Sequence, residues 1–139
     1  MTGAPATTGR RPATGLLWAL RILGAALLAV LGWIHLDLWL AGYRSIDWIG
    51  PAFLLNATAG FGLAVLLLLT PRPLLMWVAA LGALTALGTL GGLLLATTIG
   101  LFGFVESTAA DLWWESFWVE LAATVVLAAL AVLAARRRD

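Results

Sequence analysis

The sequence predicts an all-α membrane protein, an up-down-up-down bundle of four transmembrane helices with both termini in the cytoplasm. Apolar stretches fill most of the 139 residues, only 11% of the residues are charged, and the mean hydropathy is +1.02. Soluble domains carry about 25% charged residues, so the composition excludes a soluble class. The chain has no cysteine, which excludes disulfides, thiolate metal sites and thiol catalysis.

Four apolar stretches are each long enough to cross a hydrocarbon core, which needs about 20 residues. The first is too long for a signal-peptide core of about 7–15 residues, so we expect it to be retained. Residues 1–14 are small, polar and proline-containing, which predicts a disordered cytoplasmic tail. Within one domain, residues 15–139, the expected spans are 15–42, 51–70, 74–104 and 113–135.

The charges between the spans are sorted by sign. Seven of the eight arginines fall on the side of the two termini, and only Arg44 falls on the other side. The positive-inside rule therefore places both termini in the cytoplasm. We predict a multi-pass protein of the bacterial cytoplasmic (inner, plasma) membrane, in contact with the lipid bilayer. The net charge of +1 gives no reason to expect nucleic acid as a partner.

Turn residues and tryptophans mark the ends of the spans. Pro51 suits the first turn of the second helix, where a missing N–H costs nothing. The segment 70–73, Thr-Pro-Arg-Pro, predicts a tight antiparallel hairpin. Tryptophans are typical of membrane interfaces, and they are more numerous on the outer side. We expect Arg21, low on the first span, to extend to the cytoplasmic interface.

Small residues at spacings of four predict where membrane helices meet. The second span carries such a row that includes Gly60 and places Asn56 towards a neighbouring helix. The third span carries the longest row, which predicts the closest helix contact, either within the chain or with a second copy. Its members are Gly88, Gly92, Ala96 and Gly100.

Three polar side chains lie at similar depths, each on a polar or small-residue stripe of its helix: His35, Asn56 and Glu120. His35, for example, lies about 14 residues, roughly 21 Å, above Arg21. We expect these three to meet in one site near the outer surface. Asp37 points about 200° away from His35 on a straight helix, so the two do not form a chelating pair. The secondary candidates are Asp37, Tyr43, Arg44, Glu106 and Ser116.

An ionisable residue inside a membrane indicates a functional site by default. The leading hypothesis is nevertheless a non-enzymatic protein, an accessory or assembly subunit, in which the polar cluster is a structural clasp. The alternative is a small binding or transport protein for a metal ion or a small polar ligand. Direct contact between the three side chains favours the clasp, and a gap between them favours a ligand. Another membrane protein or a second copy of the chain is a possible partner.

No cofactor is expected, and no catalytic motif is present. His35 and Glu120 could contribute nitrogen and oxygen ligands to zinc or copper, but the spacing is not diagnostic. A single histidine excludes a bis-histidine haem within one chain. The residues below Glu120 are almost all aliphatic, which argues against a proton path through the membrane.

Four segments have a familiar pattern: His35-Leu36-Asp37-Leu38-Trp39, Gly42-Tyr43-Arg44-Ser45-Ile46, Ile49-Gly50-Pro51-Ala52-Phe53-Leu54-Leu55-Asn56 and the later Gly100-Leu101-Phe102-Gly103-Phe104-Val105-Glu106. Together they resemble a group of small four-helix membrane proteins found in actinobacteria. The resemblance implies the four-span topology and implies no particular activity.

Overall fold

The structure, a computed structural model, describes the backbone of residues 11–137 and the side chains of residues 14–137. It confirms the predicted all-α four-helix bundle, and each helix is long and apolar enough to cross a membrane. A short 3₁₀ helix, η1 (Tyr43–Ser45), follows the first helix. The four α-helices are α1 (Arg11–Ala41), α2 (Ile49–Leu69), α3 (Arg72–Thr98) and α4 (Trp113–Ala135).

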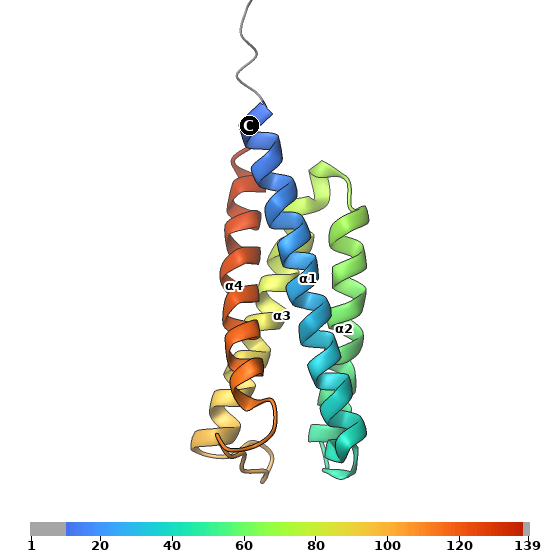
Figure 1. The fold of residues 1–139 in the computed structure, drawn as a ribbon, viewed down its shortest axis with the longest axis vertical. Coiled ribbons are helices and arrows are strands. Elements are labelled where there is room, and N and C mark those ends of the chain that lie inside the picture. The colour runs from blue at the N-terminus through green and yellow to red at the C-terminus, as the bar shows by residue number, and fades with distance from the viewer. Residues whose placement is uncertain (1–10, 138–139) are drawn as a thin grey trace, which may run out of the picture.

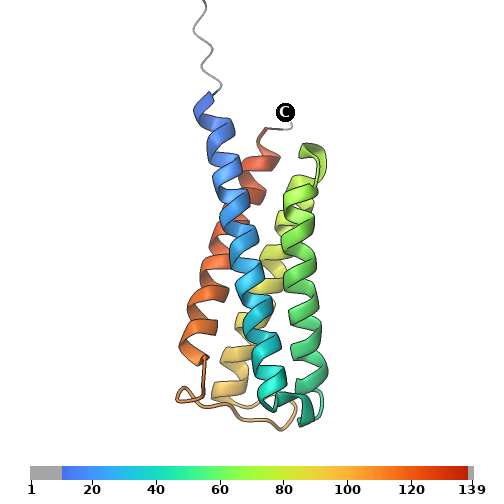
Figure 2. The same cartoon turned by 45° about the vertical axis from the view of Figure 1, so that its right-hand side comes forward.

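Consecutive helices run in opposite directions (Figures 1 and 2). The start of α1, the turn from α2 to α3 and the end of α4 lie at one end, called the inner end below. The connections at residues 42–48 and 99–112 lie at the opposite end, called the outer end. The predicted disordered tail falls mostly outside the described residues, and residues 11–14 form the first turn of α1.

The third helix is shorter than predicted, ending at Thr98 instead of Phe104. Gly100, Phe102 and Gly103 have positive φ values of 86°, 50° and 80°, which an α-helix does not allow. Leu101 and Phe104 exchange two backbone hydrogen bonds of 2.7 and 2.9 Å, so a tight turn replaces the last turns of the predicted span. This turn is apolar, so hydropathy alone did not separate it from the helix.

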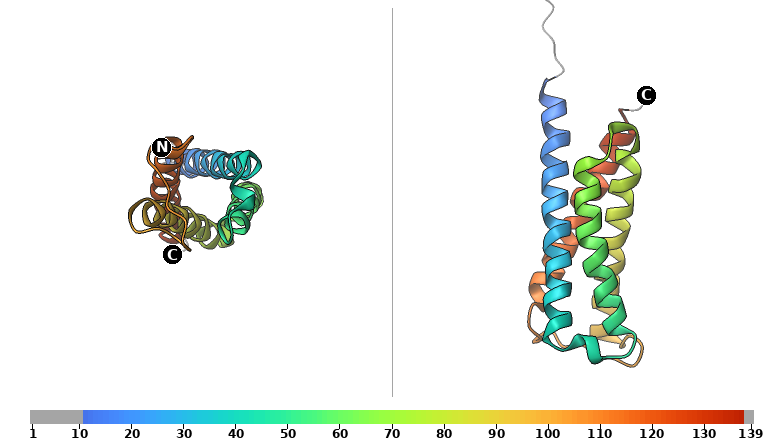
Figure 3. Two further views of the ribbon diagram at one scale, coloured as in Figure 1. Left: turned by 90° about the horizontal axis from the view of Figure 1, so that it is seen from below. Right: turned by 90° about the vertical axis from the view of Figure 1, so that its right-hand side faces the viewer.

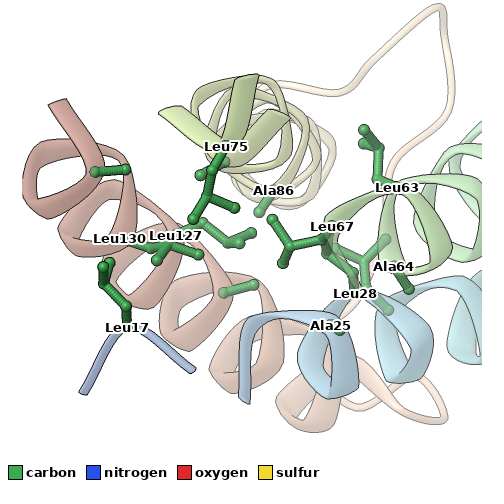
Figure 4. Close-up of a cluster of buried hydrophobic side chains, with 14 residues drawn as sticks. Leu17, Ala25, Leu28, Leu63, Ala64, Leu67, Leu75, Ala86, Leu127 and Leu130 are labelled. Carbon is green, nitrogen blue, oxygen red and sulfur yellow. The ribbon is translucent and has the colours of Figure 1, made fainter. Parts of the chain in front are cut away.

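The inner half of the bundle holds the hydrophobic core and, at its end, a pocket of about 270 Å³ lined in part by Arg72 and Arg137. Leu67, Leu127 and Leu130 are completely buried, and they belong to a core of leucines and alanines from all four helices (Figure 4). Arg21 lies in the same half, and its guanidinium reaches the end of α2 at the inner end of the bundle. It is buried, and its guanidinium donates to the Leu67 oxygen at 2.5 Å and to the Thr70 oxygen. These carbonyls end α2 and would otherwise lack partners.

The closest helix contact joins α1 and α2. A Cβ added to Gly60 would lie 2.7 Å from the Leu28 oxygen and 2.8 Å from the backbone nitrogen of Gly32. The two backbones can therefore approach this closely only because both positions are glycine. Viewed along the bundle, the helices lie around a square (Figure 3). Helix α1 packs mainly on α2 and α3 mainly on α4, whereas α2 and α3 make far fewer contacts.

Within the chain, the predicted close contact along α3 is not formed, while a contact with a second copy stays a prediction. A Cβ on Gly88 would meet nothing within 4 Å, and one on Gly92 would meet only the Leu101 side chain, at 3.9 Å. Ala96 is buried, and Gly100 lies beyond the end of the helix. The small residues of α3 therefore border a space instead of a neighbouring helix.

Candidate functional site: a polar cavity at the outer end

The outer half of the bundle contains a cavity of about 480 Å³. Its wall comes from all four helices and from the α3–α4 connection, and the Gly88 and Gly92 face of α3 forms part of it. Pockets for small molecules usually measure about 300–1,000 Å³ and combine a mostly apolar wall with a few polar groups. This cavity fits that description.

His35 and Glu120 lie together at the wall of the cavity. The distance from His35 Nε2 to Glu120 Oε1 is 3.8 Å, and the two side chains are 6% and 2% exposed. His35 Nδ1 lies 2.9 Å from the Leu31 carbonyl oxygen. Because a carbonyl only accepts hydrogen bonds, Nδ1 carries the proton and donates it there. In a neutral ring, Nε2 is then left as an acceptor.

Glu120 has an unsatisfied oxygen. Within the described part of the chain, Glu120 Oε2 is buried and has no hydrogen-bond partner. The other oxygen is also too far from His35 for a direct hydrogen bond, which needs about 2.7–3.2 Å. Leaving one such buried group unpaired costs about 1–3 kcal/mol. The carboxyl group is therefore placed to receive a group that enters the cavity.

Asn56 faces the same cavity from α2. Its Oδ1 lies 3.4 Å from Thr89 Oγ1 on α3, and the Thr89 hydroxyl donates to the Thr85 oxygen at 2.8 Å. The structure therefore brings two of the three predicted residues, His35 and Glu120, into a pair, and it places the third on another part of the same wall. Ser116, a secondary candidate one turn before Glu120 on α4, is buried and also lines the cavity.

Tyr43 and Glu106 join the two outer connections beside the cavity. The Tyr43 hydroxyl donates to Glu106 Oε2 at 2.7 Å, and the Tyr43 ring stacks on Phe53 at 4.8 Å. The Glu106 backbone N–H donates to the Ala96 oxygen at 2.9 Å, which fixes the connection to α3. Burial, followed by the hydrogen bond to Glu106, raises the pKa of Tyr43.

The remaining secondary candidates do not belong to this site. Asp37 and Arg44 are exposed and do not line the cavity. Among the side chains that the structure describes, no three His, Cys, Asp or Glu residues lie close enough together to hold a metal ion. His35 and Glu120 therefore have no third strong ligand beside them.

The cavity reaches the surface of the bundle between α2 and α3. Leu55 on α2 and Leu84 on α3 both line it, yet they are 69% and 65% exposed. Since α2 and α3 make few contacts, these leucines border a side opening. This opening faces the surface that a bilayer would cover.

The wall residues that were not among the predicted site residues include Thr89, Trp113 and Phe53. Trp113 Nε1 donates to Thr97 Oγ1 at 2.9 Å, which ties α4 to α3. The Phe53 ring centroid lies 5.0 Å from that of His35. Thr89 could have been found, because it lies in the register of the small residues on α3. Trp113 and Phe53 could not be found in this way, because the sequence does not distinguish them from aromatic residues that lie at the membrane interface.

Comparison with protein-family models, with curated proteins and with solved structures gave no match. The geometry of the cavity is therefore the ground on which a function can be proposed.

Proposed function

We propose that this integral membrane protein binds a small molecule in its outer cavity. The observation that carries the proposal is the unpartnered Oε2 of Glu120, which is buried at the wall of a cavity of about 480 Å³. Buried polar groups in proteins are nearly always hydrogen-bonded. A ligand that donates to this oxygen would satisfy it.

The accessory-subunit hypothesis is supported less well. It treats the polar cluster as a clasp, which would require direct hydrogen bonds among His35, Asn56 and Glu120. His35 and Glu120 are 3.8 Å apart, and Asn56 lies beside Thr89 instead, so direct hydrogen bonds do not join the three side chains. The cavity between them is further support for binding.

Binding at one side of the membrane is supported better than transport across it. Leu28, Ala123 and Leu127 are at most 1% exposed and belong to the hydrophobic core below the cavity. They leave no polar path from Glu120 towards the inner end. The distribution of arginines supports placing the cavity in the outer leaflet of a bacterial cytoplasmic membrane.

Filling the cavity tests the proposal. Gly92 lines it and Gly91 does not, and a Cβ on Gly91 would meet nothing within 4 Å. Gly92→Leu should therefore occupy the cavity, while Gly91→Leu makes the same change on another face of the same helix. Native mass spectrometry of protein released from membrane vesicles should detect one small-molecule adduct on the wild type and on Gly91→Leu, and none on Gly92→Leu.

Two results would contradict the proposal. One is an adduct of equal occupancy on all three proteins, since the cavity would then not be the binding site. The other is a wild-type protein without any adduct. Thermal melting of both variants in the same detergent shows that each is folded before its spectrum is interpreted.

A further inference from the structure

We propose that the ligand is a lipophilic primary or secondary ammonium ion that enters from the bilayer between α2 and α3. This inference rests on the proposed binding function and specifies the chemistry of its ligand. Three features support it: the charges around the cavity, the hydrogen-bonding capacity of the His35–Glu120 pair, and the position of the opening.

The charged residues around the cavity are acidic. Glu106, Asp111 and Glu120 line it, and among the described residues of the wall none is lysine or arginine. A cleft lined by charges of one sign raises the local concentration of the opposite ion. The Glu106 carboxyl already accepts bonds from the Tyr43 hydroxyl and from the Ser107 N–H. Glu120 is the one that has a buried oxygen without a partner.

The inner wall offers two acceptors for one donor group. Glu120 Oε2 is unpartnered, and His35, with its proton on Nδ1, presents Nε2 as an acceptor. An ammonium group has only donors to offer, as the lysine side chain does. Beside a Glu120 carboxylate and a neutral His35, it would leave the buried site without net charge, which a membrane interior favours.

Aromatic rings would add to the attraction. Phe53 lies beside the His35 ring, with the two centroids 5.0 Å apart, and Trp113 forms another part of the wall. A cation over such a ring face is attracted by the ring's π electrons, and more strongly where water is excluded.

The opening explains why the ligand should be lipophilic. The Tyr43–Glu106 hydrogen bond and the turn that contains Leu101 and Phe104 lie on the outer side of the cavity. The exposed Leu55 and Leu84 border its side. An apolar chain attached to the ammonium can therefore remain among leucines and lipid while the head reaches Glu120.

A series of ligands with one tail and different heads tests this inference. The probes are radiolabelled n-octylamine, which is a cation at neutral pH as lysine is, n-octanol and octanoate. Each is equilibrated with the full-length protein in nanodiscs, and partitioning into empty nanodiscs is subtracted. The variants are Glu120→Gln and, as a matched control, Glu115→Gln, which lies on the same helix but is exposed and outside the cavity.

We expect octylamine to bind saturably at one site. The affinity for octanol should be at least about tenfold lower, and octanoate should show no saturable binding. Glu120→Gln should lower the affinity for octylamine by at least about tenfold. Its affinity for octanol should be unchanged, which also shows that the cavity of this variant is intact. Glu115→Gln should bind all three probes as the wild type does. Octanol or octanoate binding as tightly as octylamine would overturn the ammonium inference and leave the binding function standing. An octylamine affinity unchanged in Glu120→Gln would overturn the inference as well. Absence of saturable binding for all three probes, together with no adduct in the native spectra, would overturn both.

Discussion

Nε2 of His35 on α1 lies 3.8 Å from Oε1 of Glu120 on α4, and the second carboxyl oxygen of Glu120 has no partner. Two buried polar groups at this distance are close enough to share a ligand and too far apart to satisfy each other. The inner half of the same helices is packed with leucine and alanine. Leucine and alanine thus pack below the pair, while Glu120 Oε2 stays without a partner.

The first prediction concerns the stability of the ligand-free protein. Glu120→Met removes the unpartnered oxygen and leaves His35 neutral and still bonded to Leu31. Because an unsatisfied buried polar atom costs about 1–3 kcal/mol, the free energy of unfolding should stay unchanged or rise. Denaturant titration in detergent micelles measures it. A structural clasp predicts the opposite sign, a loss of about 1–3 kcal/mol.

The four-helix architecture could be predicted because hydropathy over about 20 residues reports directly on the membrane. The turn at Pro71–Pro73 was equally visible, since proline at a helix start is a local signal. The end of α3 could not be predicted in this way, because the residues after it are as apolar as the helix itself. These residues are Gly100, Leu101, Phe102 and Gly103. Their positive φ values follow from local backbone geometry, which hydropathy does not measure.

The site was predictable only in part. Helical periodicity and depth placed His35 and Glu120 correctly, since both lie on straight helices at matching heights. Within the chain, the row of small residues on α3 does not mark the predicted helix contact, because small side chains allow either a close neighbour or an empty space. Only the distances around Gly60 and Gly88 distinguish the two cases. The side opening depends on how far α2 and α3 diverge, which no local pattern encodes.

The second prediction compares two glycines of α2. Gly60→Ala places a Cβ 2.7 Å from the Leu28 oxygen, whereas Gly62→Ala meets nothing within 4 Å. Overpacking of this kind costs about 1–3 kcal/mol, so Gly60→Ala should lower the free energy of unfolding. Gly62→Ala should leave it unchanged or raise it slightly, because alanine favours a helix. Equal stability of the two variants in denaturant titration would show that α1 and α2 do not meet at Gly60.

The third prediction concerns the orientation in the membrane. The chain has no cysteine, so single-cysteine labelling needs no background substitutions. Thr108 lies in the outer connection and Pro71 in the inner turn, and both are exposed. In intact cells a membrane-impermeant maleimide should label Thr108→Cys and not Pro71→Cys, and both should be labelled after the membrane is opened. The reversed pattern would place the cavity on the cytoplasmic side and contradict the positive-inside assignment.

The fourth prediction uses the only tyrosine in the chain, whose ionisation can be followed by tyrosinate absorption without interference from another phenol. Burial, then the hydrogen bond and charge of Glu106, raises the pKa of Tyr43 above the ordinary value of 10.0. The folded protein therefore keeps this proton at a pH where the unfolded chain has released it, so folding stability should fall as the pH rises above 10.0.

Glu106→Gln should lower the pKa of Tyr43 without returning it to 10.0, because burial, the largest cause, remains. Asp47→Asn changes an exposed residue of the other outer connection. As the matched control, it should leave the titration of Tyr43 unchanged. Tyr43→Phe gives the background absorption without tyrosinate. A wild-type midpoint at the ordinary value would mean that the Tyr43–Glu106 bond does not close the outer side of the cavity, and the ligand would then have a second entrance from water.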